Sequence, residues 1–583
     1  MHYELNKAPW IAFVLALAVY WLTVDPGASY WDCPEYLITA LRLEIGHPPG
    51  NPGWALAHRF ASCLFPDPAV QVRVVNMMSG LFTSLSVMML CSVSISLMRL
   101  VWKGRSPWRK AAISVASVSG SLCFAWCDSA WYSASEAEVY AMSLFLTALT
   151  VWMALKYAFS FSFAVRMRWL VAIAYVIGFS VGVHQLNLLA LPAVALIMTL
   201  RSRRRVGFMR SAIAFIAGCA AVVVILKVIM PGSVALAGMA DLFAVNTLGL
   251  PYWSGAAVFW ILALTCVVAA AVVSSGKFRS FSVSMWCLAA VMTGFSVYIL
   301  IPVRACANPP VNEGNPSDIF RFSDYLSRRQ YADAPLLYGR TPYSRVMRVE
   351  RVTVDECGDS VYDYSWNALE MDGRDMRPMV AGARLRERSR FITDADRKMN
   401  SRVSADSVLR GYVVAGVHSK AVYTPELNMW LPRIYSGSAD DIAAYGDWTG
   451  MDSASMVRVR ISEALDSLGH PVAMRDAAGN TMERYAYRPS YLHSLIYMSG
   501  YQVGYMYLRY LMWNFAGRQN DISSTGEIDH GNFLTGLPVL DGMMLGPQSE
   551  MPDELCAGNR GHNMRWSVLF LLGLIGANGK AHV

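Results

Sequence analysis

Two acidic residues near the N-terminus are the first side chains suited to proton transfer. Asp32 and Glu35 lie three residues apart in YWDCPEYLITALRLEIGHPPGNPGW, which places both on one face where a helix begins. The leucine-rich residues that follow continue this helix along an apolar surface. The His-Pro-Pro-Gly sequence at 47–50 is expected to end it, because proline cannot continue a helix. The alternative is that the two carboxylates only cap and solvate an interfacial helix.

A second acidic stretch strengthens the catalytic interpretation. The segment CDSAWYSASEAEVYAM carries Asp128, Glu136 and Glu138 and contains no lysine or arginine. Carboxylates crowded at the mouth of a helix bundle repel one another, which raises the pKa of at least some of them. Such groups suit general acid–base chemistry.

Polar residues at two further turns are candidates for ligand binding. His184 and Asn187 lie between two short apolar segments, and Arg304 directly follows a long one. An arginine at a lipid–water boundary commonly anchors a headgroup, but beside acids and a histidine it can hold a lipid-linked phosphate by a bidentate charged pair. For His184 a plain hydrogen bond within the turn is an equal alternative.

The composition indicates what must position these residues. The chain has 583 residues, of which 55% are hydrophobic and 16% charged, against roughly 25% charged in soluble proteins. This excludes an ordinary cytosolic enzyme, a disordered chain and a secreted disulfide scaffold. The eleven cysteines form no CxxC pair, so we expect no disulfide framework and no zinc site.

Apolar runs of membrane-spanning length predict a helix bundle. The nine candidates are 8–24, 77–98, 111–127, 137–155, 169–183, 186–200, 211–230, 255–274 and 282–301. The fold class expected is an all-α polytopic membrane protein, a bundle of about 9–10 transmembrane helices with an extracytoplasmic mixed domain.

Basic residues between the runs alternate in a way that sets the orientation. The connections that follow the second, fourth, sixth and eighth runs contain Lys or Arg. The connections that follow the third, fifth and seventh runs, 128–136, 184–185 and 231–254, contain none. By the positive-inside rule the N-terminus is cytoplasmic and the acidic loops are periplasmic or otherwise extracytoplasmic, in a multi-pass protein of the cell inner membrane. A nucleic-acid-binding patch would not alternate in this manner, so we expect a lipid bilayer and no nucleic acid as partner.

The expected domains follow from this topology. Residues 1–303 form the transmembrane domain, with catalytic outer loops 25–76 and 128–136. Residues 304–565 form the extracytoplasmic domain and include an aromatic helix, 491–514, that we expect at the membrane interface rather than across it. Residues 566–583 form a C-terminal hydrophobic segment.

Acids, a histidine and an arginine on one side of the membrane suit group transfer from a lipid phosphate to a hydroxyl. A carboxylate removes the proton of the acceptor hydroxyl, and a cation stabilises the departing phosphate. Trp31, beside Asp32, is placed to shield that carboxylate from water and to stack on a sugar, as is Tyr30.

Long motifs resemble one family. WDCPEYLITALRLEIGHPPGNP resembles the first-loop signature of a bacterial family of GT-C-type membrane glycosyltransferases, formerly a domain of unknown function, that is similar to animal transmembrane protein O-mannosyltransferases. Further segments resemble it in order, among them SASEAEVYAMS, IGFSVGVHQLNLLALP, PVRACANPPVNEGNP, YLSRRQYADAPLLYG and YLRYLMWNFAGRQNDI. The resemblance extends from about Asp32 to Gly576.

The resemblance implies a function and site roles. It implies transfer of a sugar, most simply mannose, from a polyprenyl-phosphate donor to Ser or Thr hydroxyls of a translocated protein, with no cofactor and no required metal. Asp32 is then the general base with Glu35 beside it, and the second-loop acids join the catalytic set. Donor or substrate binding is assigned to the residues Trp31, His47, His184, Asn187 and Arg304. Family members usually continue past the last hydrophobic stretch, so we expect a short or truncated member.

Three alternatives stay open at this stage. A GT-C transferase acting on a lipid or glycan acceptor fits the same residues, and two carboxylates leave Mg²⁺ or Mn²⁺ possible. A transporter is less favoured, since the sequence shows no internal repeat, and the only basic residue well inside an apolar run, Lys227, lies near an outer end. An inactive scaffold is disfavoured by the complete acid set.

Overall fold

The computed structural model resolves two compact units. It describes residues 7–102, 106–199, 207–331, 334–335, 337–354, 360–379, 393–405, 411–466, 468–476 and 479–578. Unit 1 comprises Met1–Tyr331, Met376–Arg386 and Thr393–Val414. Unit 2 comprises Ala332–Asp375, Glu387–Ile392 and Ala415–Val583. All the candidate site residues lie in unit 1.

Unit 1 is built almost entirely from helices. The first half contains α1 (Ala8–Leu22), α2 (Cys33–Arg42), α3 (Pro52–Ser62), α4 (Pro68–Val101), α5 (Pro107–Ala125), α6 (Asp128–Ser135), α7 (Val139–Phe159) and α8 (Phe163–Val181). The second half contains η1 (Gln185–Ala190), α9 (Leu191–Thr199), α10 (Phe208–Val224), η2 (Ile225–Ile229), α11 (Met230–Asn246), α12 (Ser254–Val273), α13 (Arg279–Phe295), η3 (Ser296–Ile299), α14 (Leu300–Cys306), α15 (Ile319–Leu326) and α16 (Asp394–Ala405).

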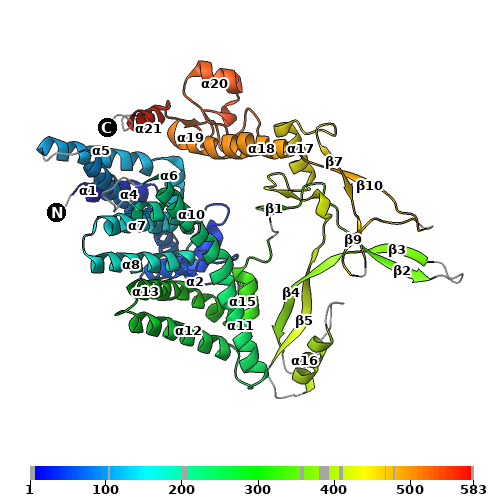
Figure 1. Cartoon of the computed structure of the whole chain (residues 1–583). Helices are drawn as coiled ribbons and strands as arrows, with labels where there is room; N and C mark the ends of the chain where they lie inside the picture. The colour runs from blue at the N-terminus through cyan, green and yellow to red at the C-terminus, as the bar shows by residue number, and fades with distance from the viewer. Residues whose placement is uncertain are drawn as a thin grey trace. The chain divides into compact units, whose positions relative to one another are not determined.

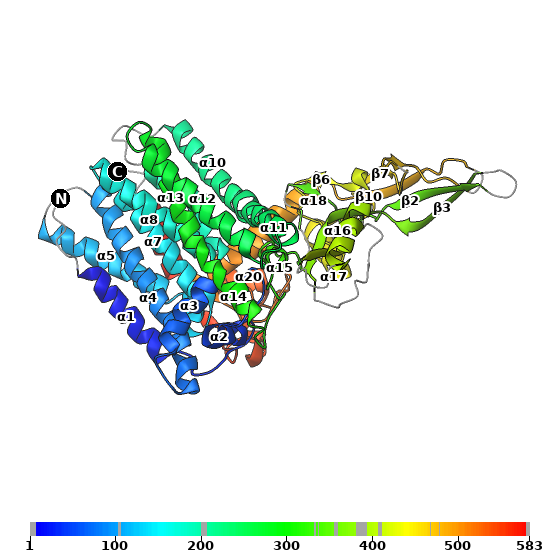
Figure 2. The same cartoon turned by 90° about the horizontal axis from the view of Figure 1, so that it is seen from below.

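The long helices of unit 1 pack side by side. Neighbours follow the order α1, α4, α7, α8, α13, α12 and α11, as Figures 1 and 2 show. Glycines allow the closest of these approaches. A Cβ atom added at Gly178 of α8 would collide with the backbone of Val291, and one at Gly294 of α13 would collide with the backbone of Tyr175. The helix bundle predicted from the sequence is therefore confirmed.

Each predicted span coincides with an apolar helix, but not all are long enough to cross a membrane by themselves. Within the described residues six helices meet the length and hydropathy required, and a seventh is possible if α5 and α6, bent by 66°, form one broken span. The segments Ala8–Leu22 and Gln185–Thr199 are shorter apolar helices. The chain is thus a polytopic helical membrane protein.

Three boundaries differ from the predictions. The expected loop 231–254 is largely helical, because α10 continues through the π-helical turn η2 into α11. The expected loop 128–136 contains the helix α6. Helix α2 ends at Leu43, which adopts a left-handed backbone conformation (φ 52°), well before the prolines at 48 and 49 that were expected to end it.

Unit 2 contains short sheets and a long aromatic helix. The strands are β1 (Tyr338–Gly339), β2 (Arg348–Val354), β3 (Ser360–Asn367), β4 (Leu369–Pro378), β5 (Tyr412–Ala421), β6 (Met429–Trp430), β7 (Val457–Ile461), β8 (Ala464–Leu465), β9 (Pro471–Val472), β10 (Arg484–Arg488), β11 (Gly517–Arg518) and β12 (Asn563–Met564), of which β4 and β5 are shared with unit 1. They pair as β3-β2-β8-β9, β1-β6, β7-β10, β4-β5 and β11-β12. The remaining helices are η4 (Pro425–Leu427), α17 (Ala439–Thr449), α18 (Tyr491–Ile496), η5 (Tyr497–Leu508), α19 (Arg509–Phe515), α20 (Pro538–Leu545), η6 (Gln548–Glu550), η7 (Asp553–Leu555) and α21 (Val568–Asn578).

The aromatic helix is continuous from α18 through η5 to α19. Its centre is π-helical, and the rings of Tyr497, Tyr501 and Tyr505 stack along one side with centroid separations of 4.8 and 5.8 Å. Tyr491 and Tyr507 are exposed instead. The helical prediction for 491–514 is confirmed, and its position at the membrane interface stays a prediction.

Candidate active site

Asp32 stands at the N-terminal end of α2 with an unengaged carboxylate. The apolar face of α2 explains why the helix is fixed: Cys33, Tyr36 and Leu37 pack into a core with Trp54 of α3. Asp32 itself is exposed, and its backbone carbonyl accepts the hydrogen bond from Tyr36 N at 3.0 Å. Its carboxylate makes no hydrogen bond to any described residue, so it is available to a ligand.

Glu35 is committed to His47. One carboxylate oxygen, Oε1, accepts from the backbone N–H of His47 at 2.7 Å and lies 2.9 Å from the ring Nδ1. Burial opposes ionisation of Glu35, but the two hydrogen bonds and the charge of His47 outweigh it and lower its pKa. The hydrogen bond to Glu35 raises the pKa of His47, although burial opposes this. Glu35 and His47 thus form an ion pair when His47 is protonated.

The second-loop acids flank the break between α6 and α7. Glu136 accepts a hydrogen bond from the Ser29 hydroxyl. Glu138 caps α7, because its side chain accepts from Val139 N at 3.1 Å. The pKa of Glu138 is raised to about 7, chiefly by burial and also by the charges of Glu136 and Asp32, against the lowering effects of the cap bond and of His47.

The two loops meet, and their charged groups influence one another. The charge of Asp32 acts on both Glu138 and His47. A direct contact joins the loops as well, since the indole N–H of Trp54 donates to the backbone carbonyl of Glu138 at 3.1 Å. The structure therefore brings Asp32, Glu35, His47, Glu136 and Glu138 into one cluster, which we call the outer acid cluster.

His184 and Asn187 lie at the turn between α8 and α9. His184 Nδ1 accepts from Leu186 N at 3.2 Å, which is the turn hydrogen bond considered above, and its ring centroid lies 5.2 Å from that of Tyr140. Asn187 is buried, and its side-chain oxygen accepts from the Ser143 and Thr147 hydroxyls of α7. Asn187 thus fastens the turn to α7 in this structure.

Arg304 and Trp31 occupy unexpected surroundings. The Arg304 guanidinium donates from Nε to Leu43 O at 2.9 Å and from Nη2 to Arg42 O at 3.1 Å. It therefore caps the C-terminal end of α2, whose last carbonyls lack partners within the helix.

Trp31 is 96% exposed and has a left-handed backbone (φ 62°), and Tyr30 is 87% exposed. Neither ring shields Asp32 from water here, but both are accessible to a substrate.

The segment that supports the first loop from behind was recognised in the sequence only as part of a family motif, and Glu313 within it was not nominated. Val311 N donates to the buried Glu44 carboxylate at 3.0 Å, and Glu313 N donates to Ile45 O at 3.1 Å. Burial raises the pKa of Glu313, and the charge of Glu35 adds to this, so Glu313 joins the outer acid cluster. The turn-forming Asn-Glu-Gly-Asn sequence directly after a span was the available signal, since it lies on the predicted face of the site.

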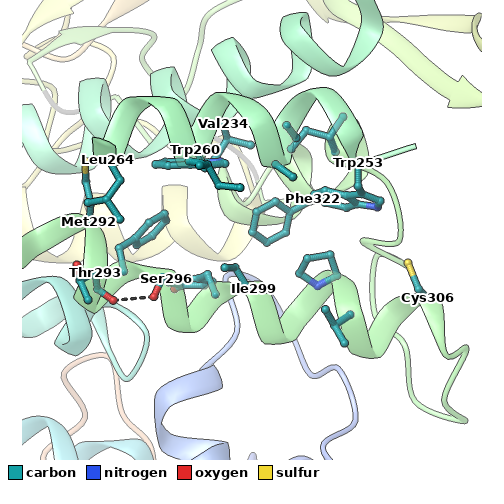
Figure 3. A pocket seen from close by; sticks show the side chains of 18 residues that line it. Val234, Trp253, Trp260, Leu264, Met292, Thr293, Ser296, Ile299, Cys306 and Phe322 are labelled. Carbon is teal, nitrogen blue, oxygen red and sulfur yellow. Dashed lines mark hydrogen bonds between the residues drawn. The ribbon is translucent and has the colours of Figure 1, made fainter. Parts of the chain in front are cut away.

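A cavity of about 760 Å³ lies between α12 and the α13–α14 helix, lined mostly by apolar side chains. Figure 3 shows Trp253, Trp260 and Phe322 around it. Its wall includes Tyr298, whose hydroxyl donates to Val181 O at 3.1 Å at the end of α8. The cavity is thus suited to an apolar chain.

The fold and the site define a polytopic membrane protein with an acid-rich cluster at one end of its helices. Comparison with protein families agrees with this description and refines it. Residues 32–207 match the model of the protein O-mannosyl-transferase TMEM260 N-terminal domain, so this part of the chain is similar to the animal transmembrane O-mannosyltransferases. The match supports a glycosyltransferase-like function and includes all of the site residues predicted from the sequence except Trp31 and Arg304.

The remainder of the chain is less informative. Residues 376–499 match a family of unknown function, DUF8416. No solved structure matches the chain.

Proposed function

We propose that the protein is a membrane O-mannosyltransferase. It moves mannose from a polyprenyl-phosphate donor to Ser or Thr hydroxyls of a translocated protein on the extracytoplasmic face. One observation carries this proposal: the unengaged Asp32 carboxylate lies in an acid cluster within the region that matches an O-mannosyltransferase domain. The GT-C arrangement is part of the proposal and rests on the sequence resemblance.

The reaction needs a base for the acceptor hydroxyl. Asp32 accepts the hydroxyl proton while the acceptor oxygen forms a bond to the anomeric carbon of the sugar. The bond from that carbon to the phosphate oxygen breaks, and polyprenyl phosphate departs with the electron pair. A positioned base of this kind contributes roughly 10²- to 10⁴-fold in rate. Glu35 is held by His47, so it orients the acceptor or tunes its neighbour in this scheme.

Two features support a lipid-linked donor. The acid cluster lies at the ends of helices long enough to cross a membrane, and the apolar cavity beside α14 suits a hydrocarbon chain.

In the described residues no group of three or more His, Cys, Asp or Glu side chains is placed to hold a metal ion. We write the reaction without a metal because the family resemblance implies none, and addition of a chelator to the assay tests this choice.

A transfer assay tests the proposed function. Membranes containing the protein are incubated with radiolabelled polyprenyl-phosphate mannose and a Ser/Thr peptide, and labelled peptide is counted. The same peptide with alanine at each hydroxyl position is the control. Label in the hydroxyl peptide alone supports the proposal. Label that enters only lipid or glycan fractions would favour the other acceptor class, and no transfer from any mannose donor would refute the proposal.

A further inference from the structure

The outer acid cluster needs a cation before it can accept a phosphodiester donor. Its carboxylates belong to Asp32, Glu35, Glu136, Glu138 and Glu313, and the only basic group described among them is His47, which is paired with Glu35. An anionic headgroup placed beside them is repelled unless a positive charge lies opposite. The following inference rests on the proposed function and concerns the group that supplies this charge.

Arg304, the arginine predicted from the sequence, is already used within the fold. Two of its guanidinium nitrogens donate to the last carbonyls of α2 at 2.9 and 3.1 Å. A phosphate held bidentately at the Nε–Nη2 edge would compete for these same donors. Binding a phosphate in that way would release the C-terminal end of α2, the helix that carries Asp32 at its other end.

Arg328 lies in the turn that follows α15, and that turn is tied to the first loop. The hydroxyl of Tyr325 donates to Gly46 O at 2.7 Å, immediately before His47. Arg328 N donates to Tyr325 O at 3.2 Å, so the backbone of Arg328 is held about one turn from this anchor. Arg328 has a left-handed backbone (φ 55°), so α15, which ends at Leu326, cannot continue through it.

The side chain of Arg328 is exposed and uncommitted. Its guanidinium carbon lies 4.6 Å from the centroid of the Tyr331 ring, and it makes no hydrogen bond or ion pair with the described residues. The next residue differs: Arg329 pairs with Asp324 at 3.2 Å. Stacking on an aromatic ring leaves the edge of a guanidinium free for an anion.

Arg328 is also within electrostatic reach of the cluster. Burial lowers the pKa of His184, and the charges of Arg328 and His47 lower it further. His184 is therefore close enough to feel the charges of both His47, in the outer acid cluster, and Arg328. A ligand beside His184 is within electrostatic range of the Arg328 guanidinium.

We propose that Arg328 binds the phosphate of the polyprenyl donor, while Arg304 positions α2. The guanidinium edge of Arg328 donates to the phosphate oxygens, and it stabilises the negative charge that gathers on them as the bond to the sugar breaks. Tyr331 holds the guanidinium plane, and the link from Tyr325 to Gly46 fixes its distance from the catalytic loop.

Product inhibition provides a test that a merely structural role would not affect. The purified full-length protein in phosphatidylcholine nanodiscs is titrated with polyprenyl phosphate and with neutral polyprenol of the same length, and inhibition of mannose transfer is measured. The variants are Arg328→Ala, Arg328→Lys and Arg329→Ala, the last being a matched control one residue away. Repeating the titration with phosphatidylglycerol present separates donor phosphate from bulk headgroups.

The expected result is specific to the phosphate. Arg328→Ala should weaken inhibition by polyprenyl phosphate roughly 10- to 150-fold and raise the donor KM similarly, the range for loss of a charge-assisted contact. Inhibition by polyprenol should not change, Arg328→Lys should recover little, and Arg329→Ala should behave as wild type.

Other outcomes would overturn the inference. If wild-type protein transfers mannose and Arg328→Ala loses affinity for both lipids equally or for neither, Arg328 does not bind the phosphate. The same holds if the loss appears only with phosphatidylglycerol present, because Arg328 is then a headgroup anchor. If the wild-type protein transfers no mannose at all, the proposed function fails and this inference fails with it.

Discussion

Four acidic side chains nominated from the sequence share one cluster, but they differ in their hydrogen-bond partners. Glu35 accepts from His47, Glu136 accepts from Ser29, and Glu138 accepts from the backbone of its own helix. The Asp32 carboxylate has no such partner in the described part of the chain. A base must have a free lone pair at the start of the reaction, so hydrogen bonding favours Asp32 among the four.

Glu138 should make donor binding dependent on pH. Its pKa is raised to about 7, so it is neutral below that pH and adds a negative charge above it. The donor KM should therefore rise as pH increases through about 7, by about 2- to 5-fold for a partly screened interaction of roughly 0.5–1 kcal/mol. Initial rates at varied donor concentration between pH 5.5 and 8.5 measure this. Glu138→Gln, which cannot ionise, should abolish the rise, and a rise retained in that variant would exclude Glu138 as its source.

The Glu35–His47 pair can be tested without altering a charged residue. A Cβ atom added at Gly46 would overlap Glu35 Oε1, so Gly46→Ala should break the hydrogen bonds between Glu35 and His47. We expect Gly46→Ala and Glu35→Gln to reduce transfer by a similar factor of about 10, the effect of losing roughly 1–2 kcal/mol of positioning. Gly207→Ala, where nothing lies within 4 Å of the added atom, is the control. Wild-type rates in Gly46→Ala would show that the pair has no part in turnover.

At the scale of elements, helix α2 is held along its apolar face and at its C-terminal end. Its apolar face packs on α3, Arg304 caps its C-terminal end, and the 311–313 segment runs beside residues 44–45. The contacts join parts of the chain more than 250 residues apart. A carboxylate at the start of such a helix keeps its position, which is what a general base requires.

Arg304→Ala should loosen α2 rather than abolish donor binding. The loss of charged hydrogen bonds costs about 1.5–3 kcal/mol each at most, and part of this appears as local opening. Hydrogen exchange at residues 40–45 should accelerate by at least about 10-fold. The affinity for polyprenyl phosphate should fall less than in Arg328→Ala. Unchanged exchange together with a lost donor affinity would restore Arg304 as the phosphate ligand.

The sequence predicted the elements better than their ends and their partners. Every apolar run predicted as a span is helical, but hydropathy cannot distinguish a span from its helical extension, so α11 was taken for a loop. Proline was expected to end α2, whereas a left-handed Leu43 and the Arg304 cap end it, and neither feature can be recognised locally. The two acidic loops were expected on one face and do meet. Arg328 and Glu313 were not nominated, because their importance lies in contacts between distant segments.

At the scale of the whole molecule, the orientation of the chain in the membrane is a prediction that still has to be tested. The charge alternation puts residues 25–76 and the chain after α14 outside the cytoplasm. Single cysteines at Ser327 and Ser404, in a background with exposed native cysteines replaced, should react with a membrane-impermeant maleimide in intact cells. A cysteine at Lys277, on the predicted cytoplasmic side, should react only after permeabilisation. The opposite pattern would invert the topology and remove the site from the extracytoplasmic face.

The most direct test of the central claim is a comparison of Asp32→Asn with Glu138→Gln in the mannose-transfer assay at matched membrane levels. Asp32→Asn keeps the shape of the side chain and removes its basicity, so the protein should insert and bind polyprenyl phosphate as wild type does. Transfer should fall roughly 10²- to 10⁴-fold, whereas Glu138→Gln should retain most of it at neutral pH. Near-normal transfer by Asp32→Asn together with an inactive Glu138→Gln would contradict the account and place the base in the second loop.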